Sequence, residues 1–403
     1  DGTEAGTVRV KDIRPGSNSS SPSNFVEVNG TLFFSANHGS SGNELWKSDG
    51  TAAGTVLVKD IRSGANSSSI AYLTNLQGML FFRANDGSTG YELWKSDGTE
   101  AGTVRVKDIR PGSNSSSPSN FVEVNGTLFF AANDGSKGTE LWKSDGTEAG
   151  TTIVKDIRTG SSSSSLSYLT IMNDHFYFRA HDGSRGYELW KSDGTEAGTV
   201  LVKDIQTGSG SSSPNYLTEV NGTLYFSAND GTLSSELWKS DGTEAGTTMV
   251  KDINPGSSSS SLNSLTDVNG TLFFRASDGS TGYELWKSDG TQAGTSLVKD
   301  IWPNSSSSSP NNFIAVNGTL FFSANDGLTG TELWKSDGTQ AGTVLAKEIY
   351  FGKRAGMNDF YFDYQMSIMP NSSSPSILTS YKGMLVFRAS DPEGQELWKY
   401  DPN

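Results

Sequence analysis

The sequence of 403 residues has no cysteine, and that absence excludes several kinds of chemistry. Without a thiol there is no disulfide, no thiolate metal ligand and no cysteine nucleophile. No apolar run approaches the length of about 20 residues that a membrane-spanning helix needs. The first residues, Asp1 to Glu4, lack the pattern of a signal peptide, so we expect a mature product or a fragment of a longer protein.

Basic residues are also scarce. The chain has 31 Lys and Arg against 45 Asp and Glu, which gives a formal net charge of −14. Nucleic acids and anionic membrane surfaces both attract concentrated patches of Lys and Arg, and the sequence contains no such cluster. It therefore predicts no nucleic-acid partner and no membrane insertion. Hydrophobic residues make up only 33%, but they gather in short runs that suit a layered core.

What the sequence does contain is a repeat. The stretch Glu-Leu-Trp-Lys-Ser-Asp-Gly-Thr begins at Glu44 and returns at a fixed interval of 48 residues, and an eighth copy ends at Trp398 after an interval of 64 residues. The tryptophans of the regular copies are Trp46, Trp94, Trp142, Trp190, Trp238, Trp286 and Trp334. A period of this length with four strand-like runs is typical of a β-propeller blade, because one small sheet cannot bury both faces alone.

Each repeat divides into four runs of strand-forming residues. In the first repeat they are Phe25 to Val28, Thr31 to Ala36, Glu44 to Lys47 and Val56 to Ile61. Asn29-Gly30 joins the first two and predicts a type I′ hairpin turn. A polar, serine-rich loop follows each fourth strand and connects it to the next repeat.

The order of strands along the chain also predicts how the fold closes. The chain begins with a fourth strand, Thr7 to Ile13, and ends with the third strand of the last repeat, Glu396 to Asp401. Pairing these two ends would remove exposed sheet edges. We therefore expect an all-β fold in a single domain, residues 1–403: an eight-bladed β-propeller of four-stranded antiparallel blades, closed by an N-terminal outer strand that pairs with the C-terminal blade.

The repeated motif resembles that of a known family. Glu-Leu-Trp-x-x-Asp-Gly-Thr is intact in seven copies, whereas the copy at Glu396 reads Glu-Leu-Trp-Lys-Tyr-Asp-Pro. Over essentially the whole chain the sequence resembles the bacterial extracellular proteins named for the ELWxxDGT repeat. The resemblance implies a secreted or surface-attached repeat domain without an established common activity. It supports an extracellular or cell-surface location.

Two positions differ between odd and even repeats and supply candidate ligand-binding residues. The position directly after the Phe-Phe run holds arginine in every second repeat, and the position before the Glu of the motif holds tyrosine in three of those repeats. A guanidinium beside a phenol ring can form a cation–π pair or grip a planar ligand such as a carboxylate. The alternative is that each arginine pairs with a nearby acid and that the alternation is a relic of duplication. The residues are Arg83, Tyr91, Arg179, Tyr187, Arg275, Tyr283 and Arg388.

A further candidate surface is the stretch between Ile349 and Leu378, which contains 16 extra residues. This insertion, about residues 350–371, is rich in aromatic side chains, and aromatic content of this kind rarely stays fully solvated. Tyr350, Phe351 and Tyr361 are therefore candidate ligand-binding residues. The insertion could also plug a central channel or cover a blade edge.

Signs of metal or catalytic chemistry are weak. His38, His175 and His181 form no metal-ligand spacing, and no residue is predicted to be catalytic. The Asn-Asp-Gly-Ser loops and the Asp-Gly-Thr turns could hold calcium, but their spacing does not match a dedicated calcium loop, so capping of the turns is favoured. We predict no metal site and no cofactor.

The sequence favours a non-enzymatic extracellular binding or adhesion module that recognises glycan or protein on a surface through the loop face. Several equivalent weak sites would give avidity. The alternative is a structural spacer or a self-assembling unit of a surface layer or fibre. A propeller enzyme, such as a lyase or a quinone-dependent dehydrogenase, is a third and less favoured hypothesis. Catalysis normally places unique residues in one or two blades, and the repeats show no such set.

Overall fold

The structure is a computed structural model, which describes residues 9–349, 372–381, 384–391 and 394–400. Every regular element in these residues is a β-strand. The described part contains no helix long and apolar enough to cross a membrane. The chain divides into two compact units, residues 1–204 with 208–210 and residues 205–207 with 211–403. The single domain of residues 1–403 remains a prediction.

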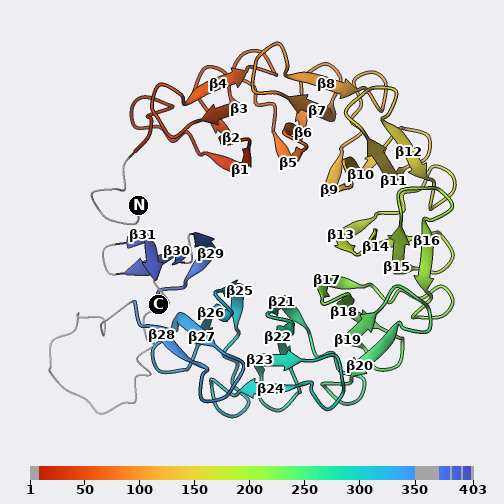
Figure 1. Cartoon of the computed structure of the whole chain (residues 1–403), viewed down its shortest axis with the longest axis vertical. Helices are drawn as coiled ribbons and strands as arrows, with labels where there is room; N and C mark the ends of the chain where they lie inside the picture. The colour runs from red at the N-terminus through yellow and green to blue at the C-terminus, as the bar shows by residue number, and fades with distance from the viewer. Residues whose placement is uncertain (1–8, 350–371, 382–383, 392–393, 401–403) are drawn as a thin grey trace, which may run out of the picture. The chain divides into compact units, whose positions relative to one another are not determined.

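The first unit contains four sheets, each of four antiparallel strands in sequence order (Figure 1). Their strands are β1 (Ser23–Val28), β2 (Thr31–Asn37), β3 (Asn43–Ser48) and β4 (Val56–Lys59); β5 (Ala71–Leu76), β6 (Met79–Asn85), β7 (Tyr91–Ser96) and β8 (Val104–Lys107); β9 (Ser119–Val124), β10 (Thr127–Asn133), β11 (Thr139–Ser144) and β12 (Thr152–Lys155); and β13 (Ser167–Met172), β14 (His175–His181), β15 (Tyr187–Ser192) and β16 (Val200–Lys203).

The second unit contains three four-stranded sheets and, among the described residues, one sheet of three strands. Their strands are β17 (Asn215–Val220), β18 (Thr223–Asn229), β19 (Ser235–Ser240) and β20 (Thr248–Lys251); β21 (Asn263–Val268), β22 (Thr271–Ser277), β23 (Tyr283–Ser288) and β24 (Ser296–Lys299); β25 (Asn311–Val316), β26 (Thr319–Asn325), β27 (Thr331–Ser336) and β28 (Val344–Lys347); and β29 (Ser376–Tyr381), β30 (Met384–Asp391) and β31 (Gly394–Tyr400).

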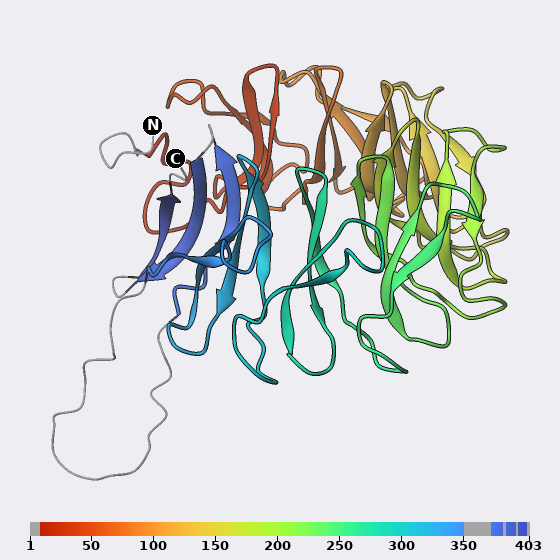
Figure 2. The ribbon, with the colours of Figure 1, turned by 60° about the horizontal axis from the view of Figure 1, so that its bottom comes forward.

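Within each unit the sheets stack in a propeller-like arrangement. The first strands of successive sheets are neighbours: β1, β5, β9 and β13 in one unit, and β17, β21, β25 and β29 in the other (Figure 1). Figure 2 shows the stacking of the β21–β24 and β25–β28 sheets from another side. The predicted repeat of four-stranded antiparallel blades is thus confirmed in seven sheets of the described residues.

The hairpin between the first two strands has the predicted turn. Asn29 has a φ of 50° and Gly30 a φ of 79°, the positive values that a type I′ turn requires. The first strand also contains a bulge: Ser23 pairs with Ser35 and Val26 with Phe33, so an extra residue lies between these pairs. The second residue of the strand has a positive φ, 57° at Asn24 and 58° at Tyr72.

The tryptophan of the motif packs between neighbouring sheets, as the sequence predicted. Trp94, on β7, belongs to a buried cluster with Val58 and Ile61. Val58 lies on β4 of the preceding sheet, and Ile61 lies in the connection that follows β4. In the second unit Trp286 packs with Val250 in the same way. Because a small sheet has two apolar faces, this contact supplies the burial that a single repeat lacks.

The glutamate of the motif anchors the serine-rich connection that crosses to the next sheet. Glu92 is fully buried, and its Oε1 accepts a hydrogen bond of 2.8 Å from the N–H of Ser116. Its Oε2 accepts bonds from the N–H of Ile109 at 3.0 Å and the hydroxyl of Ser116 at 2.6 Å. Both donors lie on the connection from β8 to β9. The glutamates that accept N–H bonds in the same way are Glu44, Glu140, Glu236, Glu284 and Glu332.

Burial dominates the ionisation of this glutamate. It raises the pKa of Glu92 to about 7, although the bonds from Ser116 and Ile109 favour the charged form. The pKa values of four further glutamates of the motif are raised to about 7 for the same reason: Glu44, Glu140, Glu236 and Glu284.

Two expectations of the sequence are not met by the described residues. Residues 9–13, part of the predicted outer strand, are not in a strand, and the β29–β31 sheet has three strands where four were expected. Closure by an N-terminal strand is therefore not detected, and residues 1–8 lie outside the described residues. The insertion at 350–371, with Tyr350, Phe351 and Tyr361, also lies outside them.

Candidate functional site

The candidate site recurs in the second, fourth, sixth and eighth sheets in chain order, which are β5–β8, β13–β16, β21–β24 and β29–β31. It lies at one end of each sheet, and we call this end the loop face. It carries the turn between the second and third strands and the serine-rich connection. In the second sheet the connection reaches this end because the N–H of Asn85 bonds to the carbonyl of Ser68 at 2.9 Å. Arg83 pairs with Ala71 on one side and Leu93 on the other, and Tyr91 pairs with Asn85. Arg83 and Tyr91 therefore lie near each other, close to the loop face.

The guanidinium of Arg83 is held between two phenol rings. Its Cζ lies 5.2 Å from the ring centroid of Tyr91 and 5.0 Å from that of Tyr72. The fourth sheet repeats this arrangement, with Arg179 Cζ at 5.2 Å from Tyr187 and 4.9 Å from Tyr168. These separations fall within the range of about 6 Å for cation–π contact, which stabilises the pair by about 0.5 to 2 kcal/mol.

The sequence did not point to Tyr72 and Tyr168. Each is the second residue of its first strand, where φ is 58° and 60°. A positive φ is unusual for an aromatic residue, and the bulge that imposes it was not foreseen. The sequence offers only a weak indication that Tyr72 and Tyr168 contact the arginines. Tyr216 stands at the same position in a repeat that has Ser227 in place of the arginine.

The remaining two arginines do not copy this arrangement. Arg275 Cζ lies 5.4 Å from the ring of Tyr283, and the position of the second ring holds Ser264. Arg388 is exposed, and its Nε donates a 3.2 Å bond to the hydroxyl of Ser376. The four alternating arginines thus divide into two with rings on both sides, one with a ring on one side, and one held by a serine.

The alternative prediction, that each arginine pairs with an acid, is not met at two of these positions. Within the described residues the ion pairs of arginine involve Arg9, Arg105 and Arg185, and none involves Arg83 or Arg275. The Nε atoms of Arg83 and Arg275 are buried without a hydrogen-bond partner in the described part. A buried donor without an acceptor costs about 1 to 3 kcal/mol.

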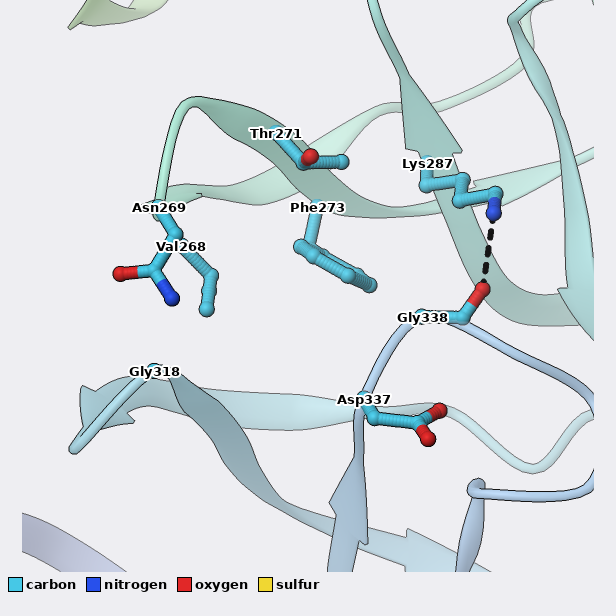
Figure 3. A pocket seen from close by; sticks show the side chains of 8 residues that line it. All are labelled: Val268, Asn269, Thr271, Phe273, Lys287, Gly318, Asp337 and Gly338. Carbon is cyan, nitrogen blue, oxygen red and sulfur yellow. Dashed lines mark hydrogen bonds between the residues drawn. The ribbon is translucent and has the colours of Figure 1, made fainter.

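A cavity of about 170 Å³ lies at the opposite end of the second unit's sheets, between the β21–β22 hairpin and the next sheet (Figure 3). Its two charged side chains, Lys287 and Asp337, are already engaged. Lys287 donates a 2.8 Å bond to the carbonyl of Gly338, and Asp337 accepts bonds from Thr339. The lysine bond joins neighbouring sheets and recurs at Lys47 with Gly98. The lining residues are Val268, Asn269, Thr271, Phe273, Lys287, Gly318, Asp337 and Gly338. This cavity is therefore part of the sheet junction.

The aspartates of the turns act as caps. Asp97 Oδ1 accepts bonds from the hydroxyl of Thr99 at 2.7 Å and from its N–H at 2.8 Å, and these bonds lower the pKa of Asp97. Asp86 Oδ1 likewise accepts bonds from the N–H groups of Ser88 and Thr89. The predicted capping is confirmed. A search of the described residues finds no group of three or more His, Asp or Glu that could hold a metal ion.

Comparison with known proteins bears on the fold. No family model and no curated protein matches the chain. Among solved structures, the chain is similar to one of two prolyl endopeptidases (13% identity, 93% of this chain, 55% of that chain, TM-score 0.49). It is also similar to puromycin hydrolase (13%, 94%, 59%, 0.44) and to the β-propeller domain of the Trilobed protease from Pyrococcus furiosus (11%, 80%, 96%, 0.39). The chain thus spans less than two thirds of the length of the first two.

These comparisons correct the prediction of a non-enzymatic binding or adhesion module. The solved structures that share the propeller-like arrangement come from hydrolases and proteases, so neither the fold nor its repetition marks the chain as non-enzymatic. The physical reason is that the repeated residues pack the sheets against one another. This packing is the same whether or not a protein has a catalytic site elsewhere. The identities of 11 to 13% relate to the fold and assign no reaction to this chain.

Proposed function

We propose that this chain is a β-propeller protein that binds small carboxylate-bearing molecules through arginines on its loop face. The observation that carries the proposal is Arg83, whose guanidinium is stacked between two rings while its Nε has no acceptor among the described residues. A guanidinium presents a planar fork of donors that matches a carboxylate in a bidentate pair. Arg179 and Arg275 are the further sites.

The stacking prepares the side chain for this role. A free arginine loses side-chain freedom when it grips a ligand, but the rings of Tyr72 and Tyr91 already fix the plane of Arg83. A negative charge on the ligand also meets no competing carboxylate in an ion pair with Arg83 among the described residues. One such contact supports weak binding, with a Kd of about 1 mM per site, equivalent to about −4 kcal/mol.

The test observes the arginine donors directly. Acetate is titrated into the isotopically labelled protein, and the Nε–H resonances of the arginines are followed by NMR. The signals of Arg83 and Arg275 should shift and saturate, because a carboxylate bound to the guanidinium changes the environment of its Nε–H group. Arg388 is the matched reference, because its Nε already donates to Ser376.

Substitution then assigns the binding. Arg83→Met, Arg179→Met and Arg275→Met together should abolish saturable binding of acetate, whereas Arg388→Met should leave it unchanged. Melting curves of each variant show whether the fold persists. Nε–H signals of Arg83 and Arg275 that stay in place at about 20 mM acetate, well above the expected Kd, would refute the proposal.

We also propose that the eight sheets close into one ring through an outer strand formed by residues near the N-terminus. The third strand of the last sheet, β31, otherwise presents an unpaired edge, and such edges promote aggregation. An extracellular or cell-surface location, a partner on a surface, self-association and a binding role for Tyr350, Phe351 and Tyr361 remain predictions from the sequence.

A further inference from the structure

The site at Arg275 lacks one side chain that its two sister sites have. In the second and fourth sheets the guanidinium has a ring on both sides, whereas in the sixth sheet Tyr283 is the one ring found over Arg275 among the described residues. The difference comes from a single position, which holds Tyr72, Tyr168 and Ser264 in the three sheets. One side of the Arg275 guanidinium is therefore without its ring.

The backbone that would carry the missing ring is unchanged. Ser264 has a φ of 57°, against 58° for Tyr72 and 60° for Tyr168. The register is also the same, because Asn263 pairs with Arg275 as Ala71 pairs with Arg83. A tyrosine at 264 would accordingly reach the guanidinium. With serine at this position, residue 264 does not fill the space that a phenol ring takes beside the arginine in the sister sheets.

The side chain of Ser264 does not take the place of the ring. Its hydroxyl donates to Oδ1 of Asn263 at 3.0 Å and lies 3.3 Å from Oδ1 of Asn311. The remaining ring of the site, that of Tyr283, is 37% exposed.

We propose that the Arg275 site binds molecules in which an aromatic ring stands next to a carboxylate, with the ligand's ring in the position that Tyr72 and Tyr168 occupy in the sister sheets. The carboxylate pairs with the terminal N–H groups of the guanidinium. The ring stacks on the guanidinium face opposite Tyr283. This inference rests on the proposed carboxylate binding and adds to it a preference for aromatic acids at one site of the three.

The probe is 4-hydroxyphenylacetate, which joins a phenol ring to a carboxylate, and the reference is acetate. Binding is measured by NMR titration of the Arg275 Nε–H resonance and by calorimetry. We expect 4-hydroxyphenylacetate to bind the Arg275 site about 3- to 10-fold more tightly than acetate, from the added contact of a ring with a guanidinium. At Arg83 the two acids should bind with similar affinity, because both faces are already covered.

Two matched variants test the position of the ring. Ser264→Tyr should fill the space and reduce the affinity of Arg275 for 4-hydroxyphenylacetate to that for acetate. Tyr72→Ser should produce the opposite change at Arg83 and create a second ring-selective site. Tyr168→Ser offers the same test in the fourth sheet if Tyr72→Ser lowers the melting temperature through loss of its contact with Phe121.

The outcomes separate the two proposals. If acetate binds but 4-hydroxyphenylacetate binds Arg275 no more tightly, the ring preference is refuted and the carboxylate site stands. If Ser264→Tyr keeps the preference, the ring lies elsewhere and the inference is wrong. If neither acid shifts the Arg275 resonance, carboxylate binding at this site is refuted as well.

Discussion

Replacing the buried glutamate of the motif by glutamine should change how the stability of the protein depends on pH. Burial raises the pKa of Glu92 to about 7, above its ordinary value of 4.5. Between these values the folded state binds more protons than the unfolded state does. The free energy of unfolding should therefore fall as the pH rises from about 4.5 to 7, and this loss is complete above pH 7.

The size of this change in the free energy of unfolding follows from how far the pKa of Glu92 is raised. A rise in pKa from 4.5 to about 7 corresponds to an upper limit of about 3.5 kcal/mol, since one pKa unit equals about 1.4 kcal/mol. We expect about 1 to 2 kcal/mol, because the connection that covers Glu92 lies near solvent, which screens the charge. Glu92→Gln removes the titration but keeps one oxygen that can accept from Ser116 or Ile109. The variant should consequently lose less stability than the natural protein between pH 5 and pH 8.

The assay is urea denaturation of both proteins at pH 5 and pH 8, followed by tryptophan fluorescence. Glu148→Gln is the matched control, because Glu148 is exposed and its carboxylate has no part in the buried contact. The control should keep the pH dependence of the natural protein. A Glu92→Gln variant that loses more stability than the natural protein as the pH rises would refute the reasoning, because the N–H donors would then favour the carboxylate more than burial opposes it.

Three further changes test the packing of the sheets. Trp94→Ala should lower the free energy of unfolding by about 3 to 5 kcal/mol in urea denaturation, because it opens a cavity between two sheets. Asn120→Asp should cost about 1 to 2 kcal/mol in the same assay, since it removes the 3.1 Å bond from Nδ2 to the carbonyl of Leu166 in the next sheet. Removing residues 1–13 should lower the melting temperature and promote association if the ring closes as proposed, and an unchanged, monomeric protein would contradict closure.

Much of the fold could be predicted because each repeat carries its own local signals. The Asn29-Gly30 turn and the spacing of Trp46 and Trp94 are properties of neighbouring residues, and the hairpins and sheet junctions follow from them. Closure is different, because it depends on a contact between the ends of the chain. The sequence patterns at Thr7 to Ile13 and at Trp398 allow that contact, but no local signal fixes it.

The candidate site was predicted in part for the same reason. Arg83 and Tyr91 lie on adjacent strands of one hairpin, so their proximity follows from register alone. Tyr72 reaches the guanidinium only because of a bulge with positive φ, which alternation along a strand does not reveal. The role of Glu92 was hidden as well, because its partners Ile109 and Ser116 lie on a connection that folds back over the strand.

The repeat provides one backbone frame in which a single side chain can vary without refolding the sheet. The second residue of the first strand keeps a φ between 53° and 60° in all eight sheets, although its side chain differs. Asparagine at this position bonds to the next sheet, as at Asn24, Asn120 and Asn312. Tyr72 and Tyr168 stack on the arginine of their sheets, whereas Ser264 supplies no ring to Arg275. Because the backbone already adopts the positive φ, exchanging these side chains alters the contact and not the strand. A change of side chain at this position can therefore make the site of one sheet differ from the site of the next sheet. The residues are Asn24, Tyr72, Asn120, Tyr168, Tyr216, Ser264, Asn312 and Ile377.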